Sequence, residues 1–254
     1  MKVIILAAGQ GTRLRPLTDE QPKCMVKFRG KPIIDYIIET VKKSGINDIV
    51  VVDGYKKSVL EQHLAGQNIK FYTNESYEST NMVYTLFSAL PELNADIIIS
   101  YADIIYETGV IQKLIDDESD FSVVVDKKWR ELWSARMDDP LKDAETMKIN
   151  EDGFIYELGK KPKCYDDIHG QYIGLIKINK SFVKTFIEYY KSLDRKSIYD
   201  GKNFNNMYMT SLIQSISDNV KKPKAVFIEG GWIEIDSIED LNAYESADIS
   251  TLRI

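Results

Sequence analysis

The sequence predicts a three-layer α/β fold of the Rossmann-like kind, with a mostly parallel mixed sheet and helices on both faces. The chain begins with a short apolar run at 2–7 that leads into a glycine-rich loop. Up to residue 120, strand-like runs alternate with helix-like segments, which is typical of parallel strands joined by helical crossovers. After residue 120, strand-like runs follow one another with little helix between them, so the second half is expected to add further strands.

The elements of the first half follow from their apolar spacing. Residues 2–7 are rich in apolar and β-branched residues, as in strands buried on both faces. Pro32 suits a first helical position, the isoleucines after it share one helical face, and Gly45 ends the pattern. We expect the next elements to be a strand at 49–52, a helix at 57–64, a strand at 69–72, a helix at 81–90 and a strand at 97–101.

The second half is expected to hold more strands than helices. A turn at Asp152-Gly153 indicates a hairpin. The remaining predicted elements are strands at 121–125, 146–149, 154–158 and 172–178, helices at 180–193 and 205–216, a strand at 224–228 and a closing helix at 238–244. Because no repeat or low-complexity linker separates the halves, we expect one domain over 1–254, made of a half at 1–120 and a half at 121–254.

Composition narrows the functional class. The chain has 254 residues, of which 44% are hydrophobic, enough to bury a large core. No stretch approaches the roughly 18 apolar residues of a membrane span, so we expect a cytoplasmic protein with no membrane partner. Two distant cysteines give neither a disulfide framework nor a metal-ligand spacing. A net charge of -6 argues against a nucleic-acid partner, because such proteins normally carry a basic surface.

The charge is distributed unevenly along the chain. Residues 10–31 contain six basic side chains and two acidic ones. A basic segment in an acidic protein suits a compact polyphosphate ligand, although a solvated charged loop would have the same composition.

The glycine loop at 9–13 follows a predicted strand, where several phosphate-binding loops occur. A Walker A loop continues with Gly-Lys-Ser/Thr, which this loop lacks. A dinucleotide-binding fingerprint has a third glycine at the position of Leu14 and leads directly into a helix. Both common alternatives therefore fail.

Three blocks in order carry a specific resemblance. They are LAAGQGTRLRPLT at 6–18, PKCM at 22–25 and GKPI at 30–33. This series resembles the signature of the nucleotidyltransferase family that includes sugar-1-phosphate nucleotidylyltransferases and CTP:phosphocholine and CTP:phosphoglutamine cytidylyltransferases. Cys24 stands where many relatives carry alanine or proline, and we expect that change to be tolerated.

The resemblance implies transfer of a nucleoside monophosphate from an NTP to a small phosphorylated acceptor. Glycines let backbone N–H groups approach phosphate oxygens, and Arg13 and Lys23 are expected to stabilise the triphosphate charge as catalytic residues. A phosphate acceptor is already ionised near neutral pH, so no general base is required and His63 and His169 need no catalytic role. The resemblance places the nucleotide on Leu6, Ala8, Gly9, Gly11, Thr12, Gly54, Thr80 and Asn81.

Two aspartates are candidate Mg²⁺ ligands. Asp103 follows the strand predicted at 97–101, and ligands of open α/β sheets bind beyond the carboxyl ends of the strands. Mg²⁺ prefers a few carboxylates together with phosphate oxygens and water. The resemblance implies that Asp103 and Asp236 bind Mg²⁺, while a helix N-cap remains the alternative for Asp236 or Ser237.

The donor and the acceptor rest largely on the resemblance. It favours CTP over the UTP, dTTP or GTP of sugar-1-phosphate enzymes, which stay the alternative, as does a non-catalytic nucleotide-binding regulatory subunit. Mixed charges and aromatic side chains in the second half suit a zwitterion such as phosphocholine, phosphoglutamine or 2-aminoethylphosphonate, with a role in cell-surface polysaccharide synthesis. Core packing would explain most of the aromatic residues equally well. Extra strands of this half are expected to wall in the acceptor. The expected acceptor-binding residues are Trp129, Arg136, Glu145, Glu157, Lys160, Tyr172 and Gly174.

Overall fold

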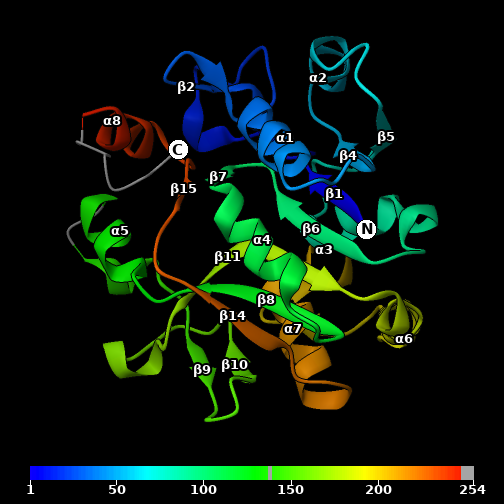
Figure 1. Cartoon of the computed structure of the whole chain (residues 1–254), viewed down its shortest axis with the longest axis vertical. Helices are drawn as coiled ribbons and strands as arrows, with labels where there is room; N and C mark the ends of the chain where they lie inside the picture. The colour runs from blue at the N-terminus through cyan, green and yellow to red at the C-terminus, as the bar shows by residue number, and fades with distance from the viewer. Residues whose placement is uncertain (137–138, 247–254) are drawn as a thin grey trace.

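A seven-stranded sheet forms the centre of the computed structural model, which describes residues 1–136 and 139–246 (Figure 1). Strand β11 runs antiparallel to both of its neighbours, and the other neighbouring pairs are parallel. Strands from both halves of the sequence therefore share one sheet. Its order is β14 (Lys224–Ile228), β8 (Phe121–Asp126), β11 (Gln171–Ile178), β6 (Ile97–Tyr101), β1 (Lys2–Leu6), β4 (Ile49–Asp53) and β5 (Ile69–Thr73).

The central strands are buried on both faces. Every residue of β1, β4 and β8 is buried, as expected for strands of a parallel sheet covered by helices on each side. Val3 on β1 pairs with Ile49 on β4 and with Ile98 on β6, so the three strands end together. Their carboxyl ends thus present the loops that follow them at one edge of the sheet.

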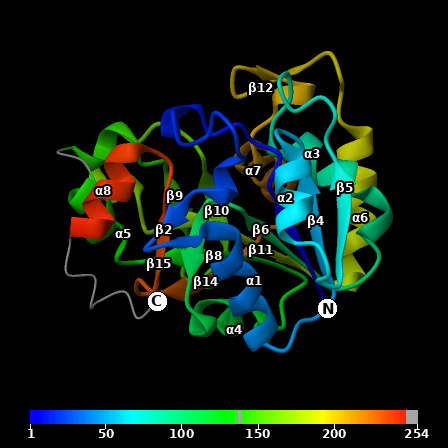
Figure 2. The ribbon, with the colours of Figure 1, turned by 90° about the horizontal axis from the view of Figure 1, so that it is seen from above.

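Helices cover both faces and form two hydrophobic cores (Figures 1 and 2). One core takes side chains from α1 (Ile33–Lys43), α2 (Lys57–His63), α4 (Thr108–Asp116), α5 (Trp129–Arg136) and α8 (Ile238–Ser246). The other takes them from α3 (Met82–Ser88), α6 (Lys180–Ser192) and α7 (Met209–Asn219). The fold is thus a three-layer α/β sandwich, and the predicted fold class is confirmed.

Four short antiparallel pairs lie outside the central sheet. They are β2 (Lys27–Phe28) with β3 (Lys31–Pro32), β7 (Ile104–Tyr106) with β15 (Trp232–Glu234), β9 (Met147–Ile149) with β10 (Ile155–Leu158), and β12 (Ile198–Tyr199) with β13 (Lys202–Asn203). In the second pair Glu234 lies opposite Ile104, and Ile235 N donates to Asp103 O at 2.9 Å. That pair brings the end of the chain beside the end of β6.

Several elements differ from the sequence-based expectation. The strands expected at 146–149 and 154–158 form a separate hairpin rather than part of the main sheet. Helices α4 and α5 were not predicted, and α5 lies where little helix was expected. The helix expected from 205 begins at Met209, because residues 204–206 form a 3₁₀ turn. Pro32 precedes the first turn of α1 instead of lying in it.

None of the helices within 1–136 and 139–246 combines the length and apolar character needed to cross a bilayer.

Candidate active site

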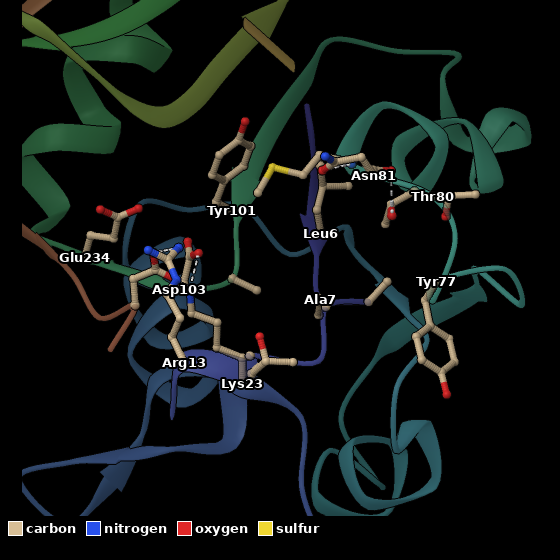
Figure 3. A pocket seen from close by; sticks show the side chains of 18 residues that line it. Leu6, Ala7, Arg13, Lys23, Tyr77, Thr80, Asn81, Tyr101, Asp103 and Glu234 are labelled. Atoms are coloured by element: carbon tan, nitrogen blue, oxygen red, sulfur yellow. Dashed lines mark hydrogen bonds and ion pairs between the residues drawn. The ribbon is translucent and has the colours of Figure 1, made fainter. Parts of the chain in front are cut away.

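A cavity of about 340 Å³ opens where β1 and β6 end (Figure 3). The glycine loop forms one wall and the start of α3 another, and Figure 3 shows Tyr77, Thr80 and Asn81 across the cavity from Arg13 and Lys23. The lining residues that sequence analysis assigned to nucleotide, catalysis or metal are Leu6, Ala8, Gly9, Gly11, Thr12, Arg13, Lys23, Thr80, Asn81, Asp103 and Asp236.

Gly11 of the glycine loop lies close to both Lys23 and Thr18. Gly11 has a φ of +64°, and a Cβ there would lie 2.8 Å from Lys23 Cβ. Its carbonyl accepts a hydrogen bond from Thr18 Oγ1 at 2.8 Å. Glycine at this position therefore permits both the left-handed turn and the close approach of Lys23. At Gly9 a Cβ would meet no atom within 4 Å, so the loop is open on that side.

Two basic side chains contact two carboxylates beside the glycine loop. Lys23 Nζ donates to Asp103 Oδ2 at 2.7 Å and to Asp236 Oδ1 at 2.5 Å, and Arg13 pairs with the other Asp236 oxygen. The Lys23, Asp103 and Asp236 side chains are each at most 16% exposed, whereas Arg13 is 66% exposed. These charges attract more strongly than they would in water because little solvent surrounds three of them.

Ser237, and not Asp236, caps the start of α8. Ser237 Oγ accepts from Asp240 N at 3.1 Å, and Asp240 Oδ2 accepts in return from Ser237 N at 2.9 Å. This reciprocal arrangement is a capping box at the start of α8. The Asp236 carboxylate points instead at Lys23 and Arg13.

The chemistry of these carboxylates fits Mg²⁺. Asp103 Oδ1 is buried and has no hydrogen-bond partner among the described residues, which leaves one hard oxygen ligand available. Residues 1–136 and 139–246 hold no group of three or more His, Cys, Asp or Glu side chains suited to a metal. A site of two carboxylates suits an ion that takes its other ligands from phosphate and water.

The far side of the cavity contains polar groups held by the loop before α3. Asn81 caps α3 by accepting from Met82 N at 2.8 Å. Thr80 Oγ1 donates to Ser76 O at 2.8 Å and accepts from Asn74 Nδ2 at 2.9 Å. Gly54 lies behind this wall, because a Cβ there would be 3.0 Å from both Ala8 and Tyr77. Gly54 thus supports the wall without lining the cavity.

A second cavity of about 280 Å³ adjoins the first. The residues common to both linings are Arg13, Asn81, Met82, Tyr101, Glu234 and Asp236. The wall of the second cavity combines carboxylates with aromatic side chains of β11, β15 and α5. Two members of the charged cluster, Arg13 and Asp236, therefore lie at the junction of the two cavities, and Lys23 and Asp103 lie on the side of the first.

Glu145 lines the second cavity and has a raised pKa. Desolvation, together with the nearby carboxylates of Asp143, Glu234 and Asp200, raises its pKa to about 7. The residue as a whole is nonetheless exposed, so a bound ligand can reach it from the second cavity. A carboxylate among like charges favours a cationic partner.

Tyr101 and Tyr172 form an edge-to-face pair in this wall, with ring centroids 5.6 Å apart. Burial raises the pKa of Tyr172 far above its usual range, so its hydroxyl stays protonated. Gly174 has a φ of +86°, and a Cβ there would lie 2.7 Å from the Tyr101 ring. Gly174 thus leaves space for Tyr101.

The expected acceptor residues are brought together only in part. Glu145, Tyr172 and Gly174 line the second cavity. Trp129 packs in the hydrophobic core and is 4% exposed, and neither Glu157 nor Lys160 reaches the cavity because Glu157 pairs with Lys148 and Lys160 elsewhere. We therefore remove these three residues from the acceptor set. The Arg136 side chain lies outside the described part of the chain.

Several cavity-lining residues were not predicted from the sequence. Glu234 lines both cavities and precedes Asp236 by two residues, a period-2 spacing that is its only sequence signal. Gln171, Tyr208 and Thr210 reach the second cavity from β11 and the start of α7. Their positions depend on tertiary packing, for which the sequence offers no local pattern.

An α/β sheet whose glycine loop faces paired cations and carboxylates, with a second cavity alongside, defines a nucleotidyltransferase. The chain belongs to the family of the MobA-like NTP transferase domain, whose profile matches residues 3–153.

Named relatives agree with this membership. The chain is 50% identical to CTP:phosphoglutamine cytidylyltransferase of Campylobacter jejuni, over 95% of this chain and 98% of that protein. It is 43% identical over 93 residues to choline-phosphate cytidylyltransferase of Streptococcus pneumoniae, over 37% of this chain and 41% of that protein.

Solved structures show the same fold. The structure of CTP:phosphocholine cytidylyltransferase from Streptococcus pneumoniae superposes with a TM-score of 0.71 at 24% identity, covering 96% of this chain and 97% of that one. The inositol-1-phosphate CTP transferase of T. maritima gives a TM-score of 0.75 at 22% identity, covering 96% and 92%.

Proposed function

We propose that this protein is a Mg²⁺-dependent cytidylyltransferase that transfers CMP from CTP to a small phosphorylated zwitterion and releases pyrophosphate. The observation that carries the proposal is that two cavities share Arg13 and Asp236, which are in contact with each other and, through Asp236, with Lys23 in the first cavity. A donor in the first cavity and an acceptor in the second would meet at this charged cluster. Strong identity to a CTP-using relative supports CTP as the donor.

In the proposed reaction an acceptor phosphate oxygen attacks the α-phosphorus of CTP. The new P–O bond forms as the bond between the α-phosphorus and its bridging oxygen breaks, and the electron pair leaves with pyrophosphate. Arg13 and Lys23 stabilise the charge on the transferring and leaving phosphates. Asp103 and Asp236 would hold Mg²⁺, which supplies neutralising charge to the phosphates when bound.

The first cavity is assigned to the nucleotide. Backbone groups of Gly9 and Gly11 face the phosphates in this assignment, with Leu6, Ala8 and Thr12 beside them. Thr80 and Asn81 lie on the opposite wall, where the base would bind, and Gly54 supports that wall from behind.

The second cavity is assigned to the acceptor. The Glu145 carboxylate would pair with an acceptor ammonium, while Arg13 at the junction lies near the acceptor phosphate. Tyr172 and Gly174 shape the wall between them. We propose phosphoglutamine as the acceptor. It carries both an ammonium group and a phosphate, and the relative with 50% identity is a CTP:phosphoglutamine cytidylyltransferase.

The segment at 157–162 does not favour a sugar-phosphate acceptor, the alternative to a zwitterion. The segment from Glu157 to Pro162 resembles a sugar-binding motif, but Glu157 forms ion pairs with Lys148 at 3.2 Å and Lys160 at 3.3 Å outside both cavities. A regulatory subunit without turnover is disfavoured because Lys23, Asp103 and Asp236 are all present and in contact.

The proposal extends to the cellular role. By resemblance to its family we propose that the enzyme acts in the cytoplasm and activates a group for cell-surface polysaccharide synthesis. Fractionation of the source cells, with the enzyme traced by antibody, would check its location.

Pyrophosphate release tests donor and acceptor together. The purified chain is incubated with Mg²⁺ and each of CTP, UTP, dTTP and GTP, combined in turn with phosphoglutamine, phosphocholine, 2-aminoethylphosphonate and glucose 1-phosphate. We expect the fastest release with CTP and phosphoglutamine. A preference for glucose 1-phosphate with another NTP would overturn the proposal.

A further inference from the structure

The two carboxylates proposed to bind the metal are bridged by one ammonium group. Lys23 Nζ contacts Asp103 Oδ2 at 2.7 Å and Asp236 Oδ1 at 2.5 Å at the same time. Asp103 and Asp236 are also the carboxylates that would hold a divalent ion. The Lys23 ammonium and such an ion would therefore compete for the negative charge of the same two carboxylates.

The charges of the cluster explain why a metal ion alone would be a poor competitor. Arg13, Lys23, Asp103 and Asp236 sum to zero net charge, Glu234 in the same cavity lining adds one negative charge, and three of the four paired side chains are largely buried. A divalent cation added by itself leaves an excess of positive charge in a site with little water, which is costly. A cation that arrives with a triphosphate brings compensating negative charge, and it offers the ammonium new oxygen partners.

We propose that Lys23 is the resident counter-ion of the metal carboxylates, so that a divalent cation binds them tightly only together with the nucleotide. The phosphates take the ammonium in exchange for the carboxylate oxygens. Because coupling between two ligands is reciprocal, the nucleotide in turn binds more tightly with the metal. This inference rests on the proposed metal role of Asp103 and Asp236.

The neighbouring contacts fix the path of this exchange. Gly11 packs against Lys23 Cβ, so the stem of the lysine is held at the glycine loop while its ammonium end reaches the carboxylates. Asp103 Oδ1 has no hydrogen-bond partner among the described residues. In this inference, rotation of the outer part of the Lys23 side chain moves the ammonium from the carboxylates to phosphates bound at the same loop.

Mn²⁺ titration of the nucleotide-free protein, followed by electron paramagnetic resonance, tests the inference. We expect Lys23→Met to bind Mn²⁺ about 10-fold more tightly than the wild type, since the competing cation is gone. Lys27→Met is the matched control, because it removes the same charge from an exposed strand residue in neither cavity lining and should leave the Mn²⁺ affinity unchanged. Equal Mn²⁺ affinity of Lys23→Met and wild type would overturn the inference.

Two further measurements keep the test decisive. Adding Asp103→Asn to Lys23→Met should remove the gain in affinity, and a gain that survives would also overturn the inference because it would lie elsewhere. If Lys23→Met does not fold, Lys23→Gln replaces it, and the rise in melting temperature caused by Mn²⁺ is compared with that of the wild type. Full CTP turnover by Asp103→Asn alone would instead contradict the proposed metal site.

Discussion

Lys23 makes several of the contacts that define the candidate active site. It contacts both proposed metal ligands, packs against Gly11 of the phosphate loop and lines the first cavity. Transfer to an ionised phosphate needs no proton abstraction, so fixed charge of this kind is the main catalytic resource. Small changes in charge at this position are therefore expected to have large effects on rate.

Loss of the charge at Lys23 or Asp103 should abolish most of the activity. We expect Lys23→Ala and Asp103→Asn each to lower kcat by at least about 100-fold, the usual scale for removing a preorganised charge from an active site. Steady-state pyrophosphate release measures the effect, with circular dichroism to verify the fold. Lys27→Ala, which alters an exposed lysine outside the cavities, serves as the control. Near-normal turnover in either site variant would refute the assigned roles.

Glu145 should make acceptor binding depend on pH. With a pKa of about 7, the carboxyl is neutral below that pH and charged above it. Only the charged form attracts an ammonium, so the penalty of Glu145→Gln on the acceptor KM should reach about 10-fold at pH 8 and shrink as the pH falls to 6. The ratio of variant to wild-type KM cancels any titration of the acceptor itself.

A matched glutamate separates this effect from a general loss of charge. Glu157→Gln removes a carboxylate that pairs with Lys148 and Lys160 outside both cavities, and it should leave the acceptor KM unchanged at every pH. A Glu145→Gln penalty that stays constant between pH 6 and 8 would show that Glu145 does not bind the ammonium as an anion.

Single residues differed in how far the sequence could locate them. Asp103 follows a strand of strong apolar character, so its place at the sheet edge was predictable. Trp129 was a poor acceptor candidate because an aromatic side chain fits core packing and a binding wall equally well, and the core holds it. Glu234 was missed since its role depends on pairing with Ile104, which is far away in the sequence.

At the scale of elements, β11 shapes the acceptor wall through an irregularity. Its pairing with β8 shifts register between Tyr172 and Ile176, and Gly174 lies inside this shift with a positive φ. Bulges of this kind redirect side chains next to active sites. The irregular turn lets Tyr101 and Tyr172 face the cavity together.

Gly174→Ala should damage both the strand and the acceptor wall. The strained backbone should lower the free energy of unfolding by about 1–3 kcal/mol, measured by urea denaturation. Contact of the new Cβ with Tyr101 should also raise the acceptor KM.

Gly45→Ala is the control for Gly174→Ala. Gly45 has a similar φ of +87°, but a Cβ there would meet no atom within 4 Å. This variant should lose stability without a change in the acceptor KM. An unaltered acceptor KM in Gly174→Ala would contradict the role of β11 in shaping the wall.

Among the elements, long apolar runs were predictable and short pairs were not. The strands at β1, β4 and β6 and the amphipathic helix α1 match their expected places, because their apolar spacing is unambiguous. The pair of β7 and β15 has three residues in each strand and joins segments far apart in the sequence. Local periodicity carries no information about such a contact, although this pair positions Asp236.

At the scale of the whole molecule, the fold brings the two cavities together, and we propose that they hold the two substrates. The first cavity lies beyond the carboxyl ends of β1 and β6, while β11 and α7 from the second half wall the second cavity. Figure 2 shows the helices on the two faces of the sheet. The architecture thus places a donor and an acceptor on either side of one cluster of charge.

The fate of a labelled phosphate distinguishes CMP transfer from transfer of any other part of CTP. The purified enzyme is supplied with Mg²⁺, phosphoglutamine and CTP that carries ³²P at either the α or the γ position, and the products are separated. The account predicts that α-label appears in a CDP-linked product and γ-label in pyrophosphate. Transfer of γ-label to the acceptor, or no transfer of α-label to any acceptor of the panel, would contradict it.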